Sequence, residues 1–472
     1  MDIKALKSSF AGQILTPGSP EYDASRAIWN AMIDRRPAAI ARCTGPADVK
    51  AAVQFAVDQN IYPAIRAGGH NAAGLAMLDD GLVIDVSPMK GIFVDPANRT
   101  ATAQTGLTWG EFDRETALYG LATTGGLISA TGIAGLTLGG GVGWLMGRCG
   151  LACDNTLSYD IVLANGELIR ANASEHSDLF WALKGGGGNF GVVTSITYRM
   201  YPISTVISGM VLHPLAHARD VLRFYRDFVM SGLPDELIVY ASALCTPDGN
   251  PVIALIPAWC GDIAEGERVL EPLRRFGSPI ADLIATMPYP AMQKMLDGAA
   301  PFGLRSYWKS RFLRDLPDEA IDTFVKYAET ITSPRSFAIL ENAHGAVSRV
   351  SGDSTAFPTR TDGFDLVLIS LWTDSQEDQR HIDWTREFFT AMQPWSAGSV
   401  YVNALDQDDI GRVPEAYGAN YARLSGVKAI YDPENRFRRN NNVQPWPNLR
   451  RNPVESTSSL TSGRTTEQTS VG

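Results

Sequence analysis

The chain has 472 residues, a formal net charge of −10, an apolar fraction of 45% and 44 glycines. A single hydrophobic core rarely serves a chain of this length, so we expect two or more domains. The acidic balance argues against nucleic acid or an anionic membrane as a main partner. No apolar run approaches the roughly 18 residues of a membrane-spanning helix, and we expect no signal peptide because the start of the chain lacks an apolar core.

The five cysteines are few, odd in number and scattered along the chain. They predict no disulfide framework. Cys149 and Cys153 lack a second Cys or His pair nearby that would complete a zinc site. We therefore expect no metal site and a reduced, cytoplasmic protein.

The first part of the chain alternates helical and strand patterns. Apolar residues recur at helical spacing in two segments, and short apolar runs between them are typical of strands. Asn165-Gly166 is a typical hairpin turn. The predicted elements are helices over 47–59, 108–121 and 177–185, strands over 61–65, 81–87, 99–106 and 191–203, and a hairpin over 157–171.

After Pro202 the glycine clusters stop and the pattern changes. Apolar strands alternate with amphipathic helices, which predicts an antiparallel sheet with helices on one face. The last 26 residues are poor in apolar side chains and rich in Ser and Thr, so we expect 447–472 to be a disordered tail. The predicted strands of this part cover 206–215, 237–245 and 252–260, and the helices cover 217–232, 317–331 and 378–392.

One histidine stands in a setting that core packing does not explain. It belongs to the run Arg66-Ala67-Gly68-Gly69-His70-Asn71, which follows a predicted strand. Two adjacent glycines let the backbone turn tightly and aim successive N–H groups at one point, which favours anion binding. Arg66 adds a fixed positive charge. The alternative explanation is a surface turn with an incidental histidine.

The other glycine clusters do not fit the common nucleotide motifs. Residues 186–191 match G-x-G-x-x-G, but they follow a helix and precede a strand, the reverse of a Rossmann turn. Glycines in 125–150 are interleaved with Ile, Leu, Val and Trp, which is not typical of a flexible linker. Buried glycine-rich backbone needs partners for its N–H groups. These segments predict a groove that suits an extended dinucleotide such as FAD, with small polar side chains from Thr123, Thr124, Ser129 and Thr131.

Five motifs in fixed order carry a family resemblance. They are RAGGHN, TTGGLISATGIAGLTLGGGVGWL, CGLACDN, DLFWALKGGGGNFGVVTSITY and NYARLSGVKAIYDPENRFRRNNNVQP. Together they resemble the berberine-bridge-enzyme-like FAD-linked oxidases, which belong to the vanillyl-alcohol-oxidase flavoprotein superfamily. The resemblance covers roughly residues 25–446.

The resemblance implies an α+β fold in two parts. A two-part FAD-binding domain of PCMH type is expected beside a substrate domain with an antiparallel sheet covered by helices. The expected FAD-binding domain is 1–204, with its PCMH-type core at about 35–204, and the substrate domain is 205–416. The segment 417–446 is expected to return to the FAD-binding domain.

In this family the histidine of the first motif is bonded to the 8α-methyl group of the flavin, which implies covalent FAD at His70. A neutral imidazole is a suitable nucleophile near pH 7. Many members add a cysteine link to flavin C6, but the matching position is Ile128, so we expect a single covalent bond. The other residues expected at the cofactor are Arg66, Ala67, Gly68, Gly69, Asn71, Thr124, Gly125, Ser129, Thr131, Gly132, Gly135, Gly139, Gly140, Gly143, Val193, Asn440 and Asn442.

The implied reaction is a two-electron oxidation. A hydride leaves a C–H bond for flavin N5, a base takes a proton from the neighbouring O–H or N–H, and dioxygen reoxidises the flavin to give hydrogen peroxide. Many relatives carry a tyrosine base at the end of a Y-x-N-Y motif on a strand. This chain has Tyr401-Val402-Asn403-Ala404 there, and alanine accepts no proton. An amine that binds in its neutral form needs no strong base.

Four side chains are candidates to replace the missing tyrosine. Tyr307 and Lys309 lie in a segment that borders the substrate pocket of relatives, although Lys309 has the alternative of pairing with an acid. His344, with Glu341 as a similar case, lies on a predicted central strand, and a structural histidine is the alternative. Tyr401 on a strand points away from the face of position 404 unless a bulge shifts the register. The remaining histidines are expected at the surface: His176, His213, His217 and His381.

The function expected from these features is an FAD-dependent oxidoreductase, an oxidase of a small alcohol, amine or phenolic compound. Its expected partners are that small molecule and dioxygen, and a homodimer is left open. One alternative is a flavin dehydrogenase that uses another electron acceptor. A second alternative is a flavin-bound protein without turnover, because Ala404 replaces the base. The substrate stays open.

Overall fold

The computed structural model describes residues 3–446, and its N-terminal part builds a four-stranded sheet. The strand order is β1-β2-β4-β3, with β1 antiparallel and the other three parallel. Helix α3 begins with a proline in its first turn and packs between this sheet and the next one. The elements are α1 (Lys4–Lys7), β1 (Gln13–Leu15), α2 (Tyr22–Arg26), β2 (Ala39–Arg42), α3 (Pro46–Asp58), β3 (Ala64–Arg66) and β4 (Leu82–Asp85).

A five-stranded antiparallel sheet follows, in the order β5-β6-β10-β8-β9. The Asn165-Gly166 turn joins β8 to β9, and Gly166 has a φ of +79° that favours glycine. A Thr108–Glu111 capping box starts α4. The elements are β5 (Ile92–Asp95), β6 (Thr100–Gln104), α4 (Trp109–Thr116), η1 (Ala117–Tyr119), β7 (Leu121–Ala122), α5 (Ile133–Leu138), α6 (Met146–Cys149), η2 (Ala152–Asn155), β8 (Thr156–Leu163), β9 (Leu168–Asn172), α7 (Ser177–Leu183), β10 (Gly191–Arg199) and β11 (Tyr201–Pro202).

The middle of the chain forms a nine-stranded antiparallel sheet. Its main path runs β16-β13-β15-β14-β19-β20-β18, and β12 and β17 pair beside β15. The strands are β12 (Thr205–Ser208), β13 (Val211–Pro214), β14 (Leu237–Cys245), β15 (Pro251–Trp259), β16 (Ala281–Asp282), β17 (Ala285–Pro288), β18 (Arg305–Leu313), β19 (Phe337–Ala343) and β20 (Gly363–Trp372).

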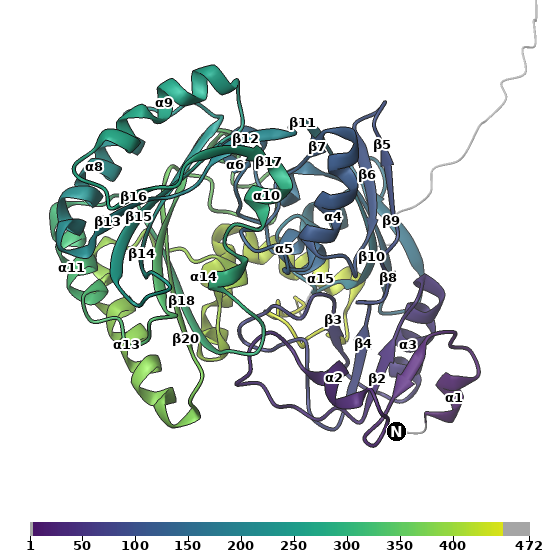
Figure 1. Cartoon of the computed structure of the whole chain (residues 1–472). Coiled ribbons are helices and arrows are strands. Elements are labelled where there is room, and N and C mark those ends of the chain that lie inside the picture. The colour runs from purple at the N-terminus through teal and green to yellow at the C-terminus, as the bar shows by residue number, and fades with distance from the viewer. Residues whose placement is uncertain (1–2, 447–472) are drawn as a thin grey trace, which may run out of the picture.

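Helices cover one face of this sheet, and the other face looks toward the N-terminal sheets (Figure 1). On β14, Leu237 and Val239 pack under the helices, while Ile238 and Tyr240 belong to the core on the opposite face. This alternation is the period-two pattern of a strand buried on both sides. The helices of this region are η3 (Leu215–His217), α8 (Ala218–Met230), α9 (Ile263–Arg275), α10 (Tyr289–Gln293), η4 (Asp297–Ala299), α11 (Asp318–Ala328), α12 (Ala346–Arg349), η5 (Ser375–Glu377), α13 (Asp378–Ala391) and η6 (Gln393–Trp395).

The last described segment returns to the N-terminal part. Lys428 is fully buried, and its Nζ donates to the carbonyl oxygens of Asn189 (2.6 Å) and Phe437 (3.0 Å) and pairs with Asp432 (2.7 Å). Asn440 Nδ2 donates to the carbonyl of Gly188 at 2.9 Å. The helices here are η7 (Val402–Ala404), η8 (Gln407–Arg412), α14 (Val413–Tyr417), η9 (Gly418–Asn420) and α15 (Tyr421–Tyr431).

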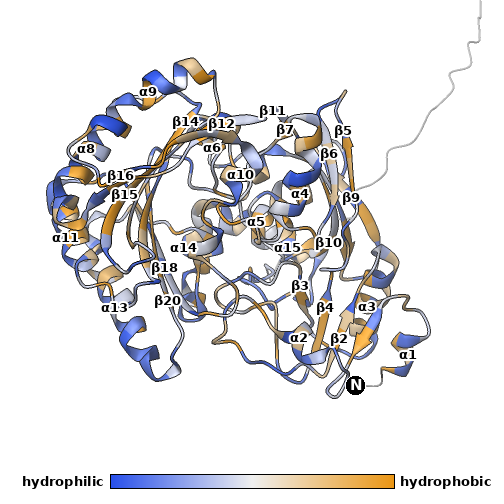
Figure 2. Cartoon of the chain, viewed as in Figure 1, coloured by the Kyte–Doolittle hydropathy of each residue, from blue (hydrophilic) through white to orange (hydrophobic). Residues whose placement is uncertain are grey.

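The expected fold class is confirmed, because an antiparallel sheet covered by helices stands beside a two-part domain of mixed helix and strand. Hydrophobic residues follow the strands, and hydrophilic residues appear on the helices outside them (Figure 2). Between residues 3 and 446 no helix has the length and apolarity to cross a membrane. The predicted tail 447–472 lies outside the described residues.

Two of the histidines expected at the surface are buried, so that prediction is wrong for them. His213 and His381 are each 1% exposed. His381 lies on the inner side of α13 and shares a hydrogen bond of 2.7 Å with Thr332. The sequence placed both beside helices or turns, but it did not show which side of those elements faces the core.

Candidate active site

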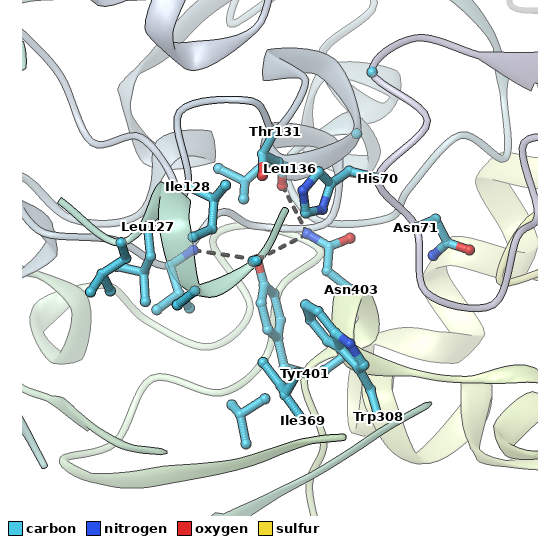
Figure 3. A pocket seen from close by; sticks show the side chains of 18 of the residues that line it. His70, Asn71, Leu127, Ile128, Thr131, Leu136, Trp308, Ile369, Tyr401 and Asn403 are labelled. Carbon is cyan, nitrogen blue, oxygen red and sulfur yellow. Dashed lines mark hydrogen bonds between the residues drawn. The ribbon is translucent and has the colours of Figure 1, made fainter. Parts of the chain in front are cut away.

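A cavity of about 980 Å³ lies between the glycine loops of the N-terminal part and the uncovered face of the nine-stranded sheet. The loops that line it follow β3 and precede α5 and β10, and the C-terminal segment closes another side. Figure 3 shows side chains from these elements pointing toward one another. The cavity therefore joins residues that lie more than 300 positions apart in the sequence.

His70 is placed at the cavity by the turn that follows β3. Gly69 has a φ of +68°, which lets the chain turn there. The imidazole stacks on Trp29 with ring centroids 4.6 Å apart, and its Nε2 is buried without a hydrogen-bond partner among the described residues. Burial lowers the pKa of His70 to about 4, so the ring is neutral at neutral pH.

Glycines let the loops approach one another and leave open space for a ligand. A Cβ on Gly68 would lie 2.5 Å from the nitrogen of Gly132, so these two loops touch through backbone alone. Gly135 and Gly188 line the cavity, and a Cβ on either meets no atom within 4 Å. A larger side chain at these two positions would enter the space that the loops enclose.

About half of the residues that the sequence placed at FAD line the cavity. These are Ala67, Gly68, Gly69, His70, Asn71, Thr131, Gly132, Gly135, Val193 and Asn440. The others do not line it: Arg66, Thr124, Gly125, Ser129, Gly139, Gly140, Gly143 and Asn442.

The supporting contacts explain several of those outer positions. The Thr124 hydroxyl donates to the carbonyl of Gly150 at 2.7 Å, and the Ser129 hydroxyl donates to Asp297 at 2.6 Å. A Cβ on Gly143 would collide with the carbonyl oxygen of Gly125. These residues hold the shape of the loops without facing the ligand space.

Sequence reasoning missed several lining residues. Gly187, Gly188 and Gly191 belong to the G-x-G-x-x-G run that fails the Rossmann test, yet all three line the cavity, as Asn440 does. The run of four glycines before a strand was the sequence feature that could have identified these lining residues. Asn403 also lines the cavity, and nothing in the sequence separated it from its neighbours.

The polar groups of the cavity fit FAD. Three buried polar atoms on the cavity walls have no hydrogen-bond partner among the described residues, namely His70 Nε2, Tyr417 Oη and Asn440 Oδ1. A flat ring system with nitrogen and oxygen atoms along its edges supplies partners for such groups. His70 and Asn440 would hold the ring edge, and the glycine loops would leave room for the rest of the dinucleotide.

Tyr401 points into the cavity, and the strand expected at 401–404 is wrong. Residues Val402–Ala404 form the short helix η7 instead, so the alternation of a strand does not apply. The Tyr401 oxygen accepts hydrogen bonds from Gly141 N (3.1 Å) and Val142 N (3.3 Å). It also accepts one from Asn403 Nδ2 at 2.9 Å (Figure 3). Burial raises the pKa of Tyr401 although the three donors oppose that change, so the hydroxyl keeps its proton.

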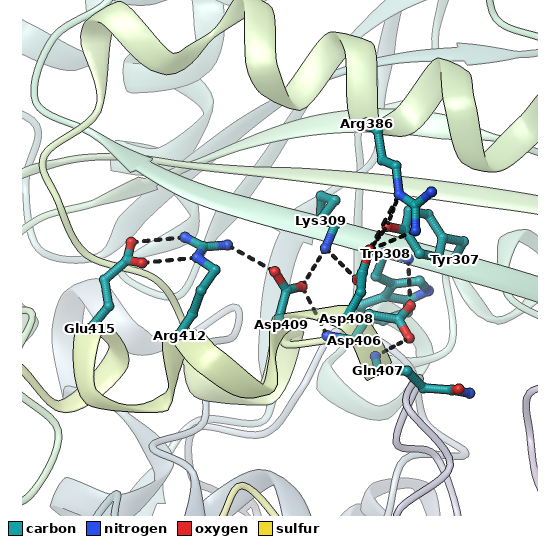
Figure 4. Close-up of polar contacts among 10 residues, drawn as sticks. All are labelled: Tyr307, Trp308, Lys309, Arg386, Asp406, Gln407, Asp408, Asp409, Arg412 and Glu415. Atoms are coloured by element: carbon teal, nitrogen blue, oxygen red, sulfur yellow. Dashed lines mark hydrogen bonds and ion pairs between the residues drawn. The ribbon is translucent and has the colours of Figure 1, made fainter.

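The other three catalytic candidates do not line the cavity. Tyr307 and Lys309 point to the helix-covered side of β18, where both contact Asp408 (2.6 Å each) (Figure 4). Trp308, between them, lines the cavity. His344 follows the end of β19 and shares a hydrogen bond of 2.7 Å with the carbonyl of Leu237. Glu341, the similar case, does line the cavity.

The fold and the cavity are those of an FAD-binding protein, and comparisons with known proteins agree. Residues 37–172 match the family model described as FAD binding domain, and residues 400–444 match the one described as berberine and berberine like. These two segments contain the His70 turn and the Tyr401 segment.

Relatives match nearly the whole chain. An FAD-linked oxidoreductase of Dictyostelium discoideum is 30% identical over 93% of this chain and 96% of its own length. The (R)-6-hydroxynicotine oxidase of Paenarthrobacter nicotinovorans is 30% identical over 93% and 97%. The crystal structure of 6-hydroxy-D-nicotine oxidase from Arthrobacter nicotinovorans superposes with a TM-score of 0.86 at 27% identity, covering 93% of this chain and 99% of that one. The chain belongs to the berberine-bridge-enzyme-like FAD-linked oxidoreductases.

Proposed function

We propose that this FAD-linked oxidoreductase is an oxidase of a small organic alcohol, amine or phenolic compound, with dioxygen as electron acceptor. The substrate loses two electrons and two protons, and dioxygen gains them to give hydrogen peroxide. The observation that carries the proposal is the neutral, unpartnered His70 in a cavity between the glycine loops and the apolar sheet face. The name of the 6-hydroxynicotine oxidase relative supports an oxidase.

His70 is the residue through which we propose a covalent bond to FAD. Because burial holds its pKa at about 4, its ring nitrogen has a free lone pair at neutral pH. Trp29 stacks against the imidazole and fixes the plane of the ring, and Trp308 meets Trp29 edge-on at 5.7 Å. When bound, FAD supplies the two-electron acceptor.

Tyr401 orients the ligand in this proposal. Three N–H donors converge on its oxygen, and no described residue accepts its own O–H. The hydroxyl therefore donates into the cavity from a fixed position. Asn403 holds this arrangement, because its amide also donates to the carbonyl of Leu136 at 3.0 Å.

The test begins with acid precipitation of the purified protein, followed by mass analysis of the peptide that contains His70. We expect the yellow colour to stay with the pellet and the His70 peptide to carry the mass of FAD. Colour in the supernatant would overturn the covalent bond. Substrate-dependent release of hydrogen peroxide in air tests the acceptor. Reduction by substrate without reoxidation in air would instead identify a dehydrogenase.

A further inference from the structure

The wall that the nine-stranded sheet contributes to the cavity is apolar. Leu212, Ile256, Ile339, Val367 and Ile369 line it. Ser242 also lines this wall, but its hydroxyl donates to the carbonyl of Ala338. The wall therefore offers few hydrogen-bonding groups to a substrate with many hydroxyls, and each hydroxyl buried without a partner costs about 1–3 kcal/mol. Most of the substrate's surface is therefore expected to be carbon.

Among the described residues that line the cavity, two have ionisable acidic or basic side chains of the Asp, Glu, Lys and Arg types. One is Arg335, which is exposed to solvent, and the other is Glu341, which is 7% exposed. Neither a hydrogen bond nor an ion pair joins the Glu341 carboxyl to another described residue. Glu341 is thus a buried polar group that borders this cavity and, with Asp365, a second cavity of about 30 Å³.

Glu341 belongs to a row of polar side chains that crosses the sheet. Tyr240 of β14 and Asp365 of β20 stand directly opposite it on the two neighbouring strands, where side chains are about 5 Å apart. Tyr240 is 0% and Asp365 is 6% exposed. Tyr240 Oη and Asp365 Oδ1 also lack a hydrogen-bond partner in the described part of the chain.

Ionisation of both carboxyls at once is unfavourable in this buried site. Burial raises the pKa of both, and the neighbouring Asp365 raises the pKa of Glu341 further. Tyr240 and Tyr401 are the titratable groups that face Glu341 from β14 and from the segment before η7. Among residues 3–446 no Lys or Arg forms an ion pair with Glu341 or Asp365, so the charge has no counter-ion within the fold.

We propose that the cavity takes a substrate with one basic nitrogen on an otherwise apolar body, and that Glu341 binds the ammonium group and accepts its proton. An ammonium supplies both the counter-charge and the N–H donors that this row lacks, whereas a carboxylate substrate would meet a like charge. Glu341 is the catalytic residue, and Asp365 is a positioning residue that acts through it.

The step balances with the reaction proposed above, on which this inference rests. One proton passes from the ammonium nitrogen to the Glu341 carboxylate and leaves a neutral amine. The amine then loses a hydride from the adjacent C–H bond and becomes an iminium ion, and the two electrons end on dioxygen. Glu341 returns its proton to solvent when the product leaves.

The test measures binding without turnover, so the flavin of the purified holoprotein is first reduced with dithionite under anaerobic conditions and cannot accept a hydride. This protein is then titrated calorimetrically, without oxygen, with three probes of one shape: N-methylbenzylamine, benzyl methyl ether and phenylacetate. A second set carries a naphthyl group in place of the phenyl group. We expect the amine to bind at least about tenfold more tightly than the ether, and phenylacetate more weakly than the ether. The proposal would be overturned if the amine and the ether bound equally tightly in both sets. It would also be overturned if neither bound measurably.

Variants separate the charge of Glu341 from its shape. Glu341→Gln should weaken amine binding by at least about tenfold and leave ether binding unchanged. The matched control is Glu387→Gln, an exposed position on α13. Asp365→Asn should not weaken amine binding, because it removes the neighbouring carboxyl that opposes ionisation of Glu341. Equal losses for amine and ether in Glu341→Gln would point to a structural role and overturn the proposal.

The outcome is separable from that of the oxidase proposal. Amine binding that depends on Glu341, without hydrogen peroxide in air, would retain the amine site and overturn the oxidase. Hydrogen peroxide formed from amines at the same rate by wild type and Glu341→Gln would retain the oxidase and overturn the amine site.

Discussion

The two faces of the nine-stranded sheet treat charge in opposite ways. Under α13, Lys309 Nζ lies 2.6 Å from Asp408 and 2.7 Å from Asp409, and Arg386 also pairs with Asp408 at 2.8 Å (Figure 4). On the cavity face, the Glu341 and Asp365 carboxyls stand side by side without a cation. One sheet therefore carries a neutralised network on one side and carboxyls without a counter-ion on the other.

The difference separates a structural role from a binding role. The Lys309 network joins β18, α13 and η8, so its groups satisfy one another within the fold. Buried charge without a partner lowers stability by several kcal/mol, and it persists where a ligand supplies the missing partner. His70 is neutral, but its buried Nε2 also lacks a partner that a ligand in the cavity would supply.

The largest effect is expected from His70→Ala, in the cavity. Loss of the imidazole removes the proposed bond to FAD and the stack on Trp29. Activity should fall on the order of a hundredfold, as expected when a reacting group shifts by about 1 Å, and acid precipitation should release the flavin. His176→Ala, at an exposed histidine, is the control. Colour that stays with the pellet of the His70 variant would exclude this residue as the link.

On the helix-covered face of the sheet, Lys309→Met should lower the stability of the fold and leave ligand binding unchanged. It leaves the Asp408 and Asp409 carboxyls without their shared cation, and breaking such a buried pair costs about 3 kcal/mol or more. Urea unfolding measures the loss, and Lys326→Met, at an exposed site on α11, is the control. A folded variant with normal stability but weakened amine binding would place Lys309 in the binding machinery and erase the contrast between the faces.

Local chemistry made one half of the site predictable. The Arg66–Asn71 run combined a strand, two glycines and a histidine, and each of these acts through its nearest neighbours in the chain. The same holds for α3 and for the Asn165-Gly166 hairpin, which were predicted within a few residues. Such features need no knowledge of distant contacts.

The other half depends on strand pairing and register. Glu341 and Asp365 are 24 positions apart, and they meet only because β19 pairs with β20 at that register. On β18 the sequence pointed to Tyr307 and Lys309, but Trp308 is the one of the three that lines the cavity. Neighbouring residues on a strand point to opposite faces of the sheet. The polar character of a side chain therefore did not show whether that side chain reaches the cavity.

A smaller effect, a gain in stability and not a loss, is expected from Asp365→Asn. Burial raises the pKa of Asp365 from 3.8 to about 7, so the folded protein keeps a proton that the unfolded chain has lost. Stability is therefore highest at low pH within this window and falls as the pH rises from about 4 to about 7, on the order of 1–4 kcal/mol. The variant removes this slope and should be more stable than wild type near pH 8.

Urea midpoints at about pH 5 and pH 8 measure that slope. The control is Asp160→Asn, at a carboxylate that pairs with Arg170 on β9, which should lower stability instead. Parallel pH curves for wild type and Asp365→Asn would show that the pKa of Asp365 is not raised in the folded protein.

The smallest effect is expected from Ile128→Cys, which tests how the cavity faces the cofactor. Ile128 and His70 both lie on the glycine-loop side of the cavity (Figure 3). A thiol at 128 is expected to form a second bond to FAD and change its absorption spectrum, with little change in stability. In the double variant His70→Ala/Ile128→Cys this bond alone should keep the flavin with the acid pellet. Ala130→Cys, exposed and outside the cavity lining, should change neither result. If the double variant releases its flavin as His70→Ala does, position 128 does not face the ring, and the orientation assigned to FAD in this cavity is wrong.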